Sequence, residues 1–457
     1  MSVLSRAGAG LLAAAGVVLL AACPSGQSKT IPPAPTASPG SAQAFFYVAE
    51  ATDPVLGTSG GRVSAYQVGS DGLLPAAPFA SISVVNPRRL LKHPVLPVLY
   101  AAGANQIFAF DITGGQLVSL CPEGTGLAPP CATDPNPGAN PFDMTIAVNA
   151  AGDYVLYVSE AGNGENLNVQ TRLAAYMLGP DGELPASPSS QQQDVTSLRF
   201  VSSVALTGIG FVYIADVSAG NMLRYVLDEN GDLPQPPVSP TPVGVPTPTP
   251  SPTPPPVTPT PSPSPTVIRA FGPSRMMAVG FPACPSPTPG LVPTFIYAVA
   301  QRQNRIAAWP VSTPAPAPDP SNTPYAGGDL PENPSSESNT RGFYNAILTD
   351  PCATHIYGAA FNNGQIDFYE LASDGNILFT TQGSTFADTA TYPTGLAWFE
   401  VTPPGGETQR TVLVSLGGAN RVDAYAVQPD GSLPERPFSS TQPIDGTFPA
   451  DIVAYVP

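Results

Sequence analysis

Charged side chains are scarce in this chain of 457 residues. They make up 11% of it, and only Lys29 and Lys92 are lysines. Acidic residues outnumber basic ones by 33 to 17, which gives a formal net charge of −16. A protein that binds a phosphate backbone needs a basic footprint, which this composition lacks. We therefore expect no nucleic-acid partner.

Histidine and the common catalytic and cofactor motifs are also rare or missing. His93 and His355 are the only histidines, and no C-x-x-C pair occurs, which argues against a zinc site. Phosphate loops, EF-hand loops, nucleotide fingerprints and Ser/His/Asp triads are not found either. We expect neither a cofactor nor a metal site.

Long apolar runs are missing except at the N-terminus. Residues 8–22 form a 15-residue apolar stretch behind Arg6, too short to span a bilayer as a helix. The stretch ends in Leu-Ala-Ala-Cys, which resembles the lipobox of bacterial lipoproteins. We interpret residues 1–22 as a lipoprotein signal peptide, Cys23 as the lipidation site, and residues 23–43 as anchor and flexible tether. The expected location is the bacterial cell envelope, with the membrane bound through the lipid. An ordinary secretory signal is the alternative.

Cysteine is scarce too, and Cys23 is one of five. An exported protein meets an oxidising compartment, so the remaining four are expected to pair. Cys121 and Cys131 flank a Pro/Gly-rich loop, which favours a local disulfide. Cys284 and Cys352 follow equivalent apolar runs in neighbouring repeat units, which favours a second disulfide. Two buried free thiols are the alternative for that pair.

Proline and glycine are abundant, at 60 and 43 residues, and nearly exclude long helices. One pattern recurs: an apolar run ending in Ala or a similar residue, a turn, a second run of the form Arg/Gln-aliphatic-x-x-Tyr/Phe, and then Asp-Gly-x-Leu-Pro. Seven copies begin at Phe45, Val98, Val155, Phe211, Phe295, His355 and Thr411. With a further apolar run between copies, each unit offers four short strands.

This repeat predicts an all-β fold over residues 44–457, a seven-bladed β-propeller of four-stranded antiparallel blades. The C-terminal run, residues 450–456, has no unit after it. We therefore expect it to close the ring by pairing with residues 45–50. Residues 234–266 form a Pro/Thr/Ser-rich insert, interpreted as an extended spacer. A ligand for a partner's aromatic groove is the alternative reading of the insert.

These units, with Asn-Pro-Arg-Arg at 86–89 and Asn-Pro-Phe-Asp at 140–143, resemble the lactonase-type seven-bladed β-propellers, which include bacterial 6-phosphogluconolactonase and other YVTN-repeat proteins. The resemblance covers about residues 44–457 outside the insert. It implies a site at the mouth of the central channel, built from Arg, His and acidic side chains. Neither histidine can be placed at that face.

The mouth is where inner strands begin and second strands end. The aligned units place a set of polar side chains there, with Gly395 at the equivalent position of the seventh unit. The expected ligand-binding residues are Glu50, Arg89, Asp143, Glu160, Asp216, Arg275, Asn345 and Asp451. The arginines could bind a carboxylate of a ligand, or Asp451, Arg89 and Asp143 could simply pair with one another.

The preferred function is a monomeric, envelope-anchored binding or scaffold module for a protein, a glycan or a small polar ligand. The alternative is a lactone hydrolase, for which the catalytic candidates are Arg89, Asp143, Glu160 and Arg275.

Overall fold

The computed structural model describes residues 44–52, 61–104, 106–120, 132–133, 140–161, 172–193, 201–206, 210–216, 221–233, 241–242, 273–280, 294–300, 305–311, 336–339, 343–378, 383–386, 392–403, 405–442 and 447–457. They belong to the unit 39–457. Cys23, the tether, Cys121, Cys131, Cys284 and the Pro-rich insert, apart from residues 241–242, lie outside the described residues.

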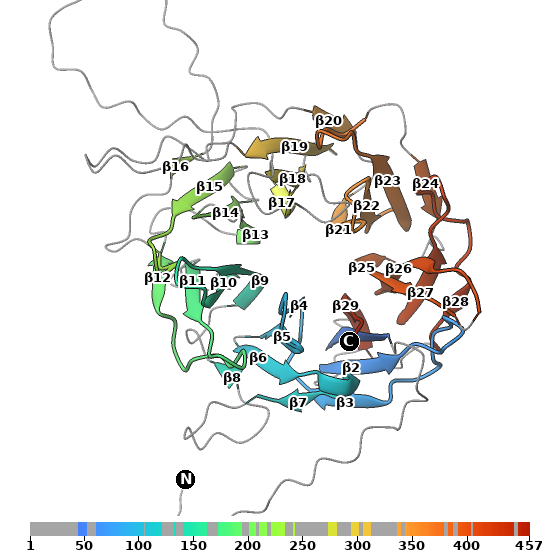
Figure 1. Cartoon of the computed structure of the whole chain (residues 1–457), viewed down its shortest axis with the longest axis horizontal. Helices are drawn as coiled ribbons and strands as arrows, with labels where there is room; N and C mark the ends of the chain where they lie inside the picture. Colours follow the sequence, from blue (N-terminus) through green and yellow to red (C-terminus); the bar gives the residue numbers. More distant parts are fainter. Residues whose placement is uncertain are drawn as a thin grey trace, which may run out of the picture. The chain divides into compact units, whose positions relative to one another are not determined.

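Six antiparallel sheets have four strands each and form blades of a propeller (Figure 1). The first blade contains β29 (Thr447–Tyr455), β1 (Phe45–Thr52), β2 (Arg62–Gln67) and β3 (Ala80–Ser83). The blade of the third unit contains β9 (Asn140–Val148), β10 (Tyr154–Ala161), β11 (Arg172–Met177) and β12 (Ser190–Gln193). The blade of the fourth contains β13 (Val201–Leu206), β14 (Phe211–Asp216), β15 (Asn221–Val226) and β16 (Thr241–Pro242).

The last three units repeat the same order. The fifth contains β17 (Pro273–Gly280), β18 (Thr294–Ala300), β19 (Arg305–Val311) and β20 (Ser336–Asn339). The sixth contains β21 (Tyr344–Thr349), β22 (His355–Ala360), β23 (Gln365–Glu370) and β24 (Gly383–Phe386). The seventh contains β25 (Pro393–Val401), β26 (Gln409–Leu416), β27 (Arg421–Ala426) and β28 (Ser439–Ser440).

The second unit departs from the prediction, so the structure has six four-stranded blades, not seven. Its sheet has five strands: β4 (Arg89–Lys92), β5 (Val98–Gly103), β6 (Gln106–Asp111), β7 (Val118–Ser119) and β8 (Ala132–Thr133). Both β7 and β8 pair with β6, at different positions along it. The short 3-10 helix η1 (Thr113–Gly115) stands where other units have Asp-Gly. The outer strand is thus split into two short pieces, separated in sequence by a Pro/Gly-rich stretch that is poor in ladder donors.

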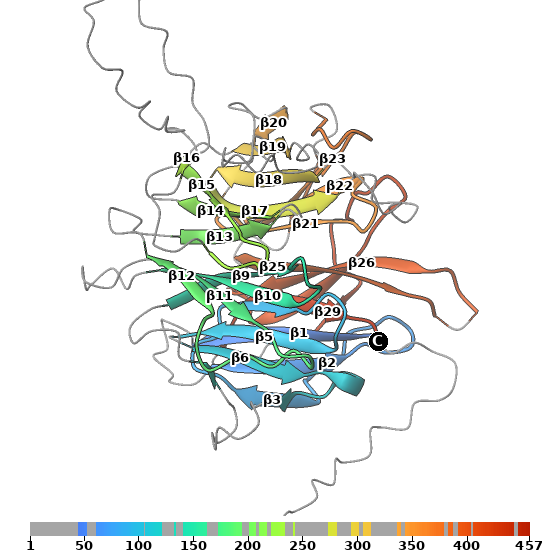
Figure 2. The same cartoon turned by 60° about the vertical axis from the view of Figure 1, so that its left-hand side comes forward.

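The C-terminal strand closes the ring as predicted. β29 pairs antiparallel with β1, from Phe45 opposite Tyr455 to Thr52 opposite Thr447. The innermost strands β29, β4, β9, β13, β17, β21 and β25 contact one another in that circular order around the centre of the ring (Figures 1 and 2). The first blade therefore joins the two ends of the described chain.

The core of the described residues lies between neighbouring sheets. Alternating side chains on each strand face the sheets on either side, so an aromatic residue such as Tyr66 or Tyr176 is fully buried. One cluster joins Phe46 of the first blade to Leu413 of the last, which completes the packing around the ring. Burial against both neighbours explains why the second strands read as nearly continuous apolar runs.

In several sheets, a tyrosine on the second strand forms a hydrogen bond with the next sheet. Tyr157 donates its hydroxyl hydrogen to the carbonyl of Gly231 at 2.6 Å. Gly231 belongs to the next unit's Asn-Gly turn and has a φ of 79°, a conformation that favours glycine. Equivalent bonds join Tyr100 to Gly182, Tyr297 to Gly375 and Tyr357 to Gly431. The repeated Tyr and turn Gly are thus halves of one contact between neighbouring sheets.

Replacing Tyr157 with phenylalanine should lower the free energy of unfolding by about 1–2 kcal/mol, because the Gly231 carbonyl loses its buried donor. The matched control is Tyr47→Phe, since the buried Tyr47 hydroxyl has no hydrogen-bond partner among the described residues. Urea denaturation of both variants provides the measurement. Equal losses of stability would show that the bond to Gly231 contributes nothing.

Candidate functional site at the centre of the ring

One backbone irregularity recurs at the start of the inner strands. β29, β9, β13, β17, β21 and β25 each shift register against their second strand, with two residues opposite one. Such β-bulges re-aim the side chains around them. Each inner strand can be aligned with the others by the residue that pairs with the fifth residue of its second-strand run. This equivalent position is occupied by Asp451, Arg89, Asp143, Ser203, Arg275, Ala346 and Gly395.

The alignment corrects the expectation for Asn345. Asn345 is the extra residue of the bulge, and Ala346 lies opposite Ala359 at the equivalent position. Asn345 still contributes to the centre through its backbone, because its carbonyl accepts a hydrogen bond from Arg275 Nε. The predicted register was off by one residue, because a bulge leaves no mark in the apolar pattern, and a ligand-binding role for Asn345 stays a prediction.

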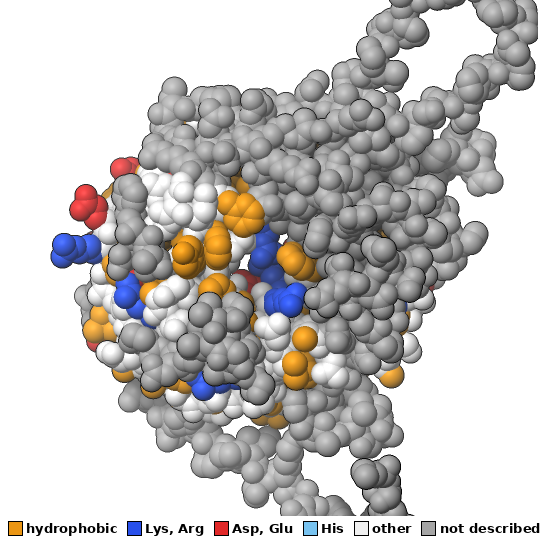
Figure 3. All heavy atoms as spheres, turned by 180° about the vertical axis from the view of Figure 1, so that it is seen from behind, with side chains coloured by type: hydrophobic (Ala, Val, Ile, Leu, Met, Phe, Trp, Pro, Cys, Tyr) orange, Lys and Arg blue, Asp and Glu red, His pale blue; other side chains and the backbone are white. Residues whose placement is uncertain are grey.

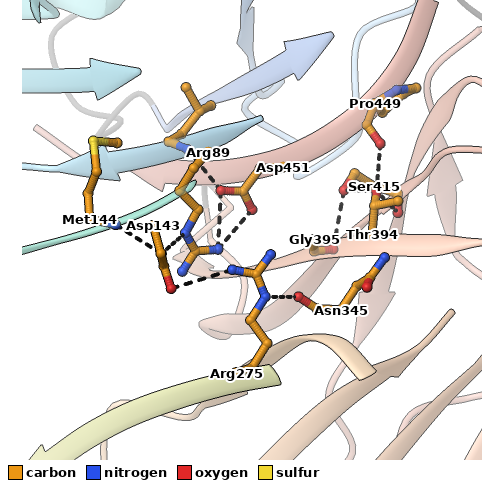
Figure 4. A network of polar contacts seen from close by, with 11 residues as sticks. Arg89, Asp143, Met144, Arg275, Asn345, Thr394, Gly395, Ser415, Pro449 and Asp451 are labelled. Atoms are coloured by element: carbon orange, nitrogen blue, oxygen red, sulfur yellow. Dashed lines mark hydrogen bonds and ion pairs between the residues drawn. The ribbon is translucent and has the colours of Figure 1, made fainter. Parts of the chain in front are cut away.

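Arg89, Asp143, Arg275 and Asp451 form one network of ion pairs (Figure 4). Arg89 Nε lies 2.8 Å from Asp143 Oδ1, and its Nη1 lies 3.3 Å from Asp451 Oδ2. Arg275 Nη1 lies 3.6 Å from the other oxygen, Asp143 Oδ2. Asp143 therefore bridges two guanidinium groups from different sheets, and the pairing that the sequence left open does occur.

Backbone donors fix the two carboxylates. Asp451 Oδ2 accepts a hydrogen bond from Leu90 N at 2.9 Å, and Asp143 Oδ1 accepts one from its neighbour Met144 N at 3.0 Å. Both aspartates are nearly fully buried. Their lone pairs are largely engaged, so the carboxylates act as fixed anions that orient the arginines.

The two guanidinium groups differ in electrostatics. Burial works against the charge on Arg89, but Asp143 and Asp451 outweigh burial and raise its pKa. Burial lowers the pKa of Arg275, and the nearby charge of Arg89 lowers it further, against the opposing effect of the two aspartates. Arg275 Nη1 has no hydrogen-bond partner among the described residues, since its contact with Asp143 lacks hydrogen-bond geometry. Arg89 Nε also lacks hydrogen-bond geometry, but it lies 2.8 Å from Asp143 Oδ1, so Arg275 is the arginine whose unbonded nitrogen lies farther from its aspartate.

Small residues occupy the part of the ring between β17 and β29, on β21 and β25. A Cβ atom on Gly395 would lie 2.9 Å from Asp451 Oδ1 and 2.8 Å from Ser415 Oγ, so the glycine makes room for the Asp451 carboxylate. The neighbouring Thr394 hydroxyl donates to the Pro449 carbonyl at 2.6 Å, tying β25 to β29. The ring is therefore charged along β29, β4, β9 and β17, and has small side chains on β21 and β25.

Glu50 and Glu160 are not part of this network, although both end second strands as expected. Each is fully buried and pairs with the arginine directly across its hairpin. Glu50 Oε2 lies 2.5 Å from Arg62 Nε, and Glu160 accepts bonds from Arg172 Nε and Nη2 at 2.6 and 2.8 Å.

Of the four catalytic candidates, Glu160 bonds to Arg172, whereas Arg89, Asp143 and Arg275 pair with one another. The side chain of Asp216 lies outside the described residues. Sequence reasoning missed the arginine partners, although each stands twelve residues after its glutamate, a shared spacing that could have revealed them.

Both histidines lie at the opposite edge of their sheets. His93 follows the far end of β4, where its Nδ1 accepts hydrogen bonds from Val95 N and Leu96 N at 3.2 and 2.9 Å. Burial, with a contribution from the Lys92 charge, lowers the pKa of His93 to about 4. His355 packs against the Gly431 turn at the same edge. Neither contributes to the network, which agrees with the sequence analysis.

Cys352 forms a disulfide bond. Its partner lies outside the described residues, so the pairing with Cys284 stays a prediction. Across the described ranges, no group of three or more His, Cys, Asp or Glu side chains is arranged to hold a metal ion. The same residues include no helix with the length and apolarity needed to cross a membrane.

Comparison with solved structures agrees on the fold. The periplasmic gluconolactonase of Pseudomonas aeruginosa superposes with a TM-score of 0.56 at 15% identity, over 90% of this chain and all (100%) of the other. A candidate 6-phosphogluconolactonase from Bacteroides fragilis gives a TM-score of 0.56 at 14% identity, over 91% and 98%. A protein from Lactobacillus plantarum gives 0.53 at 14%, over 90% and 99%.

At such identities the likeness shows a shared propeller fold and nothing finer. No protein-family model matches the sequence. No curated protein matches it either.

Proposed function

We propose that the protein is an exported propeller that binds a small polar ligand bearing a carboxylate at the centre of its ring. The observation that carries this proposal is the Arg275 guanidinium, which has a buried, unbonded Nη1. A guanidinium held by Asp143 and by the Asn345 carbonyl is already oriented, so binding costs little side-chain entropy. Two neighbouring guanidiniums favour an acceptor-rich anion over a cation.

Titration calorimetry with D-gluconate tests this proposal. Arg275→Met should weaken binding at least tenfold, because a hydrogen bond to a charged group contributes about 1.5–3 kcal/mol. Arg410→Met is the control, since the Arg410 side chain is 64% exposed and pairs with Glu400, which is also largely exposed. Its affinity should stay within about twofold of the wild type. An unchanged affinity in Arg275→Met would refute the proposed site.

Lactone hydrolysis is the second candidate, favoured by the likeness to a solved gluconolactonase. Arg275 would then polarise the lactone carbonyl. The described network offers no obvious base to activate water, because Asp143 already bridges two arginines and accepts a backbone hydrogen bond. A lactone panel assayed on the wild type and on Arg275→Met separates the two functions. If the wild type hydrolyses a lactone and Arg275→Met does not, the function of the site is catalysis and not ligand binding.

The envelope location is the remaining part of the proposal, resting on Leu-Ala-Ala-Cys before the tether. Cys23→Ser should move the protein from the membrane fraction to the soluble fraction, because acyl chains supply most of the membrane affinity. Fractionation followed by immunoblotting measures the change. Membrane retention of Cys23→Ser at the wild-type level would exclude lipid anchoring through this residue.

A further inference from the structure

Three aromatic side chains gather on the edge of the ring that carries the charged network. Phe343 directly precedes β21, Phe361 directly follows β22, and Tyr392 directly precedes β25. The rings of Phe361 and Tyr392 stack with centroids 5.0 Å apart and an interplanar angle of 26°. Phe343 contacts Phe361 edge-on at 6.2 Å. These three residues are called the aromatic cluster below.

Tyr392 is the exposed member of the cluster. Its side chain retains 46% of its accessible surface although it stacks on Phe361. Its φ of 43° lies in the left-handed region, which is costly for a bulky residue. The backbone is held there by Gly417 N, which donates to the Tyr392 carbonyl at 3.0 Å. Strain of this kind persists where the surroundings over-determine it, and it is frequent at binding sites.

The cluster borders the small-residue part of the ring. Phe343 stands two residues before Asn345, whose carbonyl binds Arg275, and Tyr392 stands three residues before Gly395. The inner strands β21 and β25 thus carry aromatic rings at their entrance, followed by Ala346 and Gly395 where other strands carry charges. Figure 3 shows hydrophobic side chains around a central hollow that contains Lys and Arg side chains on one face of the molecule. A ligand held by Arg275 beside these small residues would lie next to the strand starts that carry the aromatic cluster.

We propose that the aromatic cluster is a stacking platform and that the ligand is a six-membered sugar ring bearing a carboxylate. A pyranose has an apolar face of C–H bonds that packs on an aromatic ring, while its hydroxyls and carboxylate stay available to polar donors. A platform beside a guanidinium matches these two features at once. This inference rests on the proposed function, because it names the class of ligand that Arg275 would hold.

Titration calorimetry of the full-length protein with three probes tests the platform. D-Glucuronate has the ring and the carboxylate, D-gluconate has the carboxylate without a ring, and methyl β-D-glucopyranoside has the ring without the carboxylate. Glucuronate should bind at least tenfold more tightly than either of the others. Tyr392→Asn should remove most of that advantage over gluconate while leaving gluconate affinity within twofold, and asparagine accepts the positive φ at this position. Tyr392→Phe keeps the ring and should behave like the wild type.

The outcomes separate the two proposals. Equal binding of glucuronate and gluconate, unaffected by Tyr392→Asn, would overturn the platform and leave the Arg275 site standing. Binding of the methyl glucoside alone, lost in Tyr392→Asn, would support the platform and refute the carboxylate site. No binding of any probe would overturn both. Melting temperatures of the variants check that each is folded, and Phe361→Leu provides a second variant that removes the supporting ring without touching the strained backbone.

Discussion

Replacing Asp143 with alanine is expected to cost about 3 kcal/mol of folding stability. Removing one partner of a buried ion pair leaves the other charge uncompensated, which is more expensive than the pair itself is favourable. Here two arginines lose a shared anion, and Arg89 and Arg275 then face each other with Asp451 as the remaining carboxylate of the network. Urea denaturation monitored by tyrosine fluorescence gives the change in unfolding free energy.

Glu400→Ala is the matched control for Asp143→Ala. Glu400 forms an ion pair with Arg410, but the Glu400 side chain is 44% exposed and the Arg410 side chain is 64% exposed. Water and salt screen such a pair, so its loss should cost less than about 1 kcal/mol. Similar losses in the two variants would mean that the central network is as well solvated as the surface.

The second large effect is expected at the hairpin of the third unit. Arg172→Met should cost about 3 kcal/mol, because Glu160 is left fully buried without its cation. The double variant Glu160→Leu with Arg172→Met should recover most of this loss, since an apolar pair has no desolvation penalty. Thermal and chemical denaturation of the single and double variants form the cycle that measures the pair.

The first blade supplies the comparison for Arg172→Met. Arg62→Met breaks the equivalent pair with Glu50, but the side chain of Arg62 is 35% exposed, and Tyr66 also donates to Glu50 at 3.3 Å. Water and the Tyr66 hydroxyl can partly compensate the charge of Glu50, so Arg62→Met should lower the free energy of unfolding less than Arg172→Met does. A larger loss for Arg62→Met than for Arg172→Met would contradict the role given to burial.

Local repeats explain why much of the fold could be predicted from the sequence. Each unit repeats its strands and its turn. The C-terminal run belongs to no further unit, and the one strand position left open in the predicted ring was beside β1. The second unit was mispredicted because its outer strand is split between β7 and β8, a detail set by chain pairing rather than by apolar periodicity. Composition alone does not distinguish one outer strand from two short ones.

The positions of the central charged residues were predicted in part, for a related reason, and their role as a site stays a prediction. Arg89, Asp143, Arg275 and Asp451 follow the repeat and meet at the centre. The register of Asn345 was off by one residue because of a bulge. Strand alignment gave Glu50 and Glu160 a backbone position but did not reveal the arginine that each one pairs with. The aromatic cluster went unnoticed because its members come from three separate turns between elements.

Closure of the ring by β29 and β1 also bears on how the protein is made. Strand β1 is the first of the described strands to be synthesised, yet its inner neighbour β29 is the last. Until then one side of β1 is an unpaired edge, the kind of surface that recruits other chains. Contacts between such distant segments also slow folding. This edge of the nascent chain therefore stays open over almost the whole of its synthesis, and a product that stops before Thr447 leaves it open to aggregation or proteolysis.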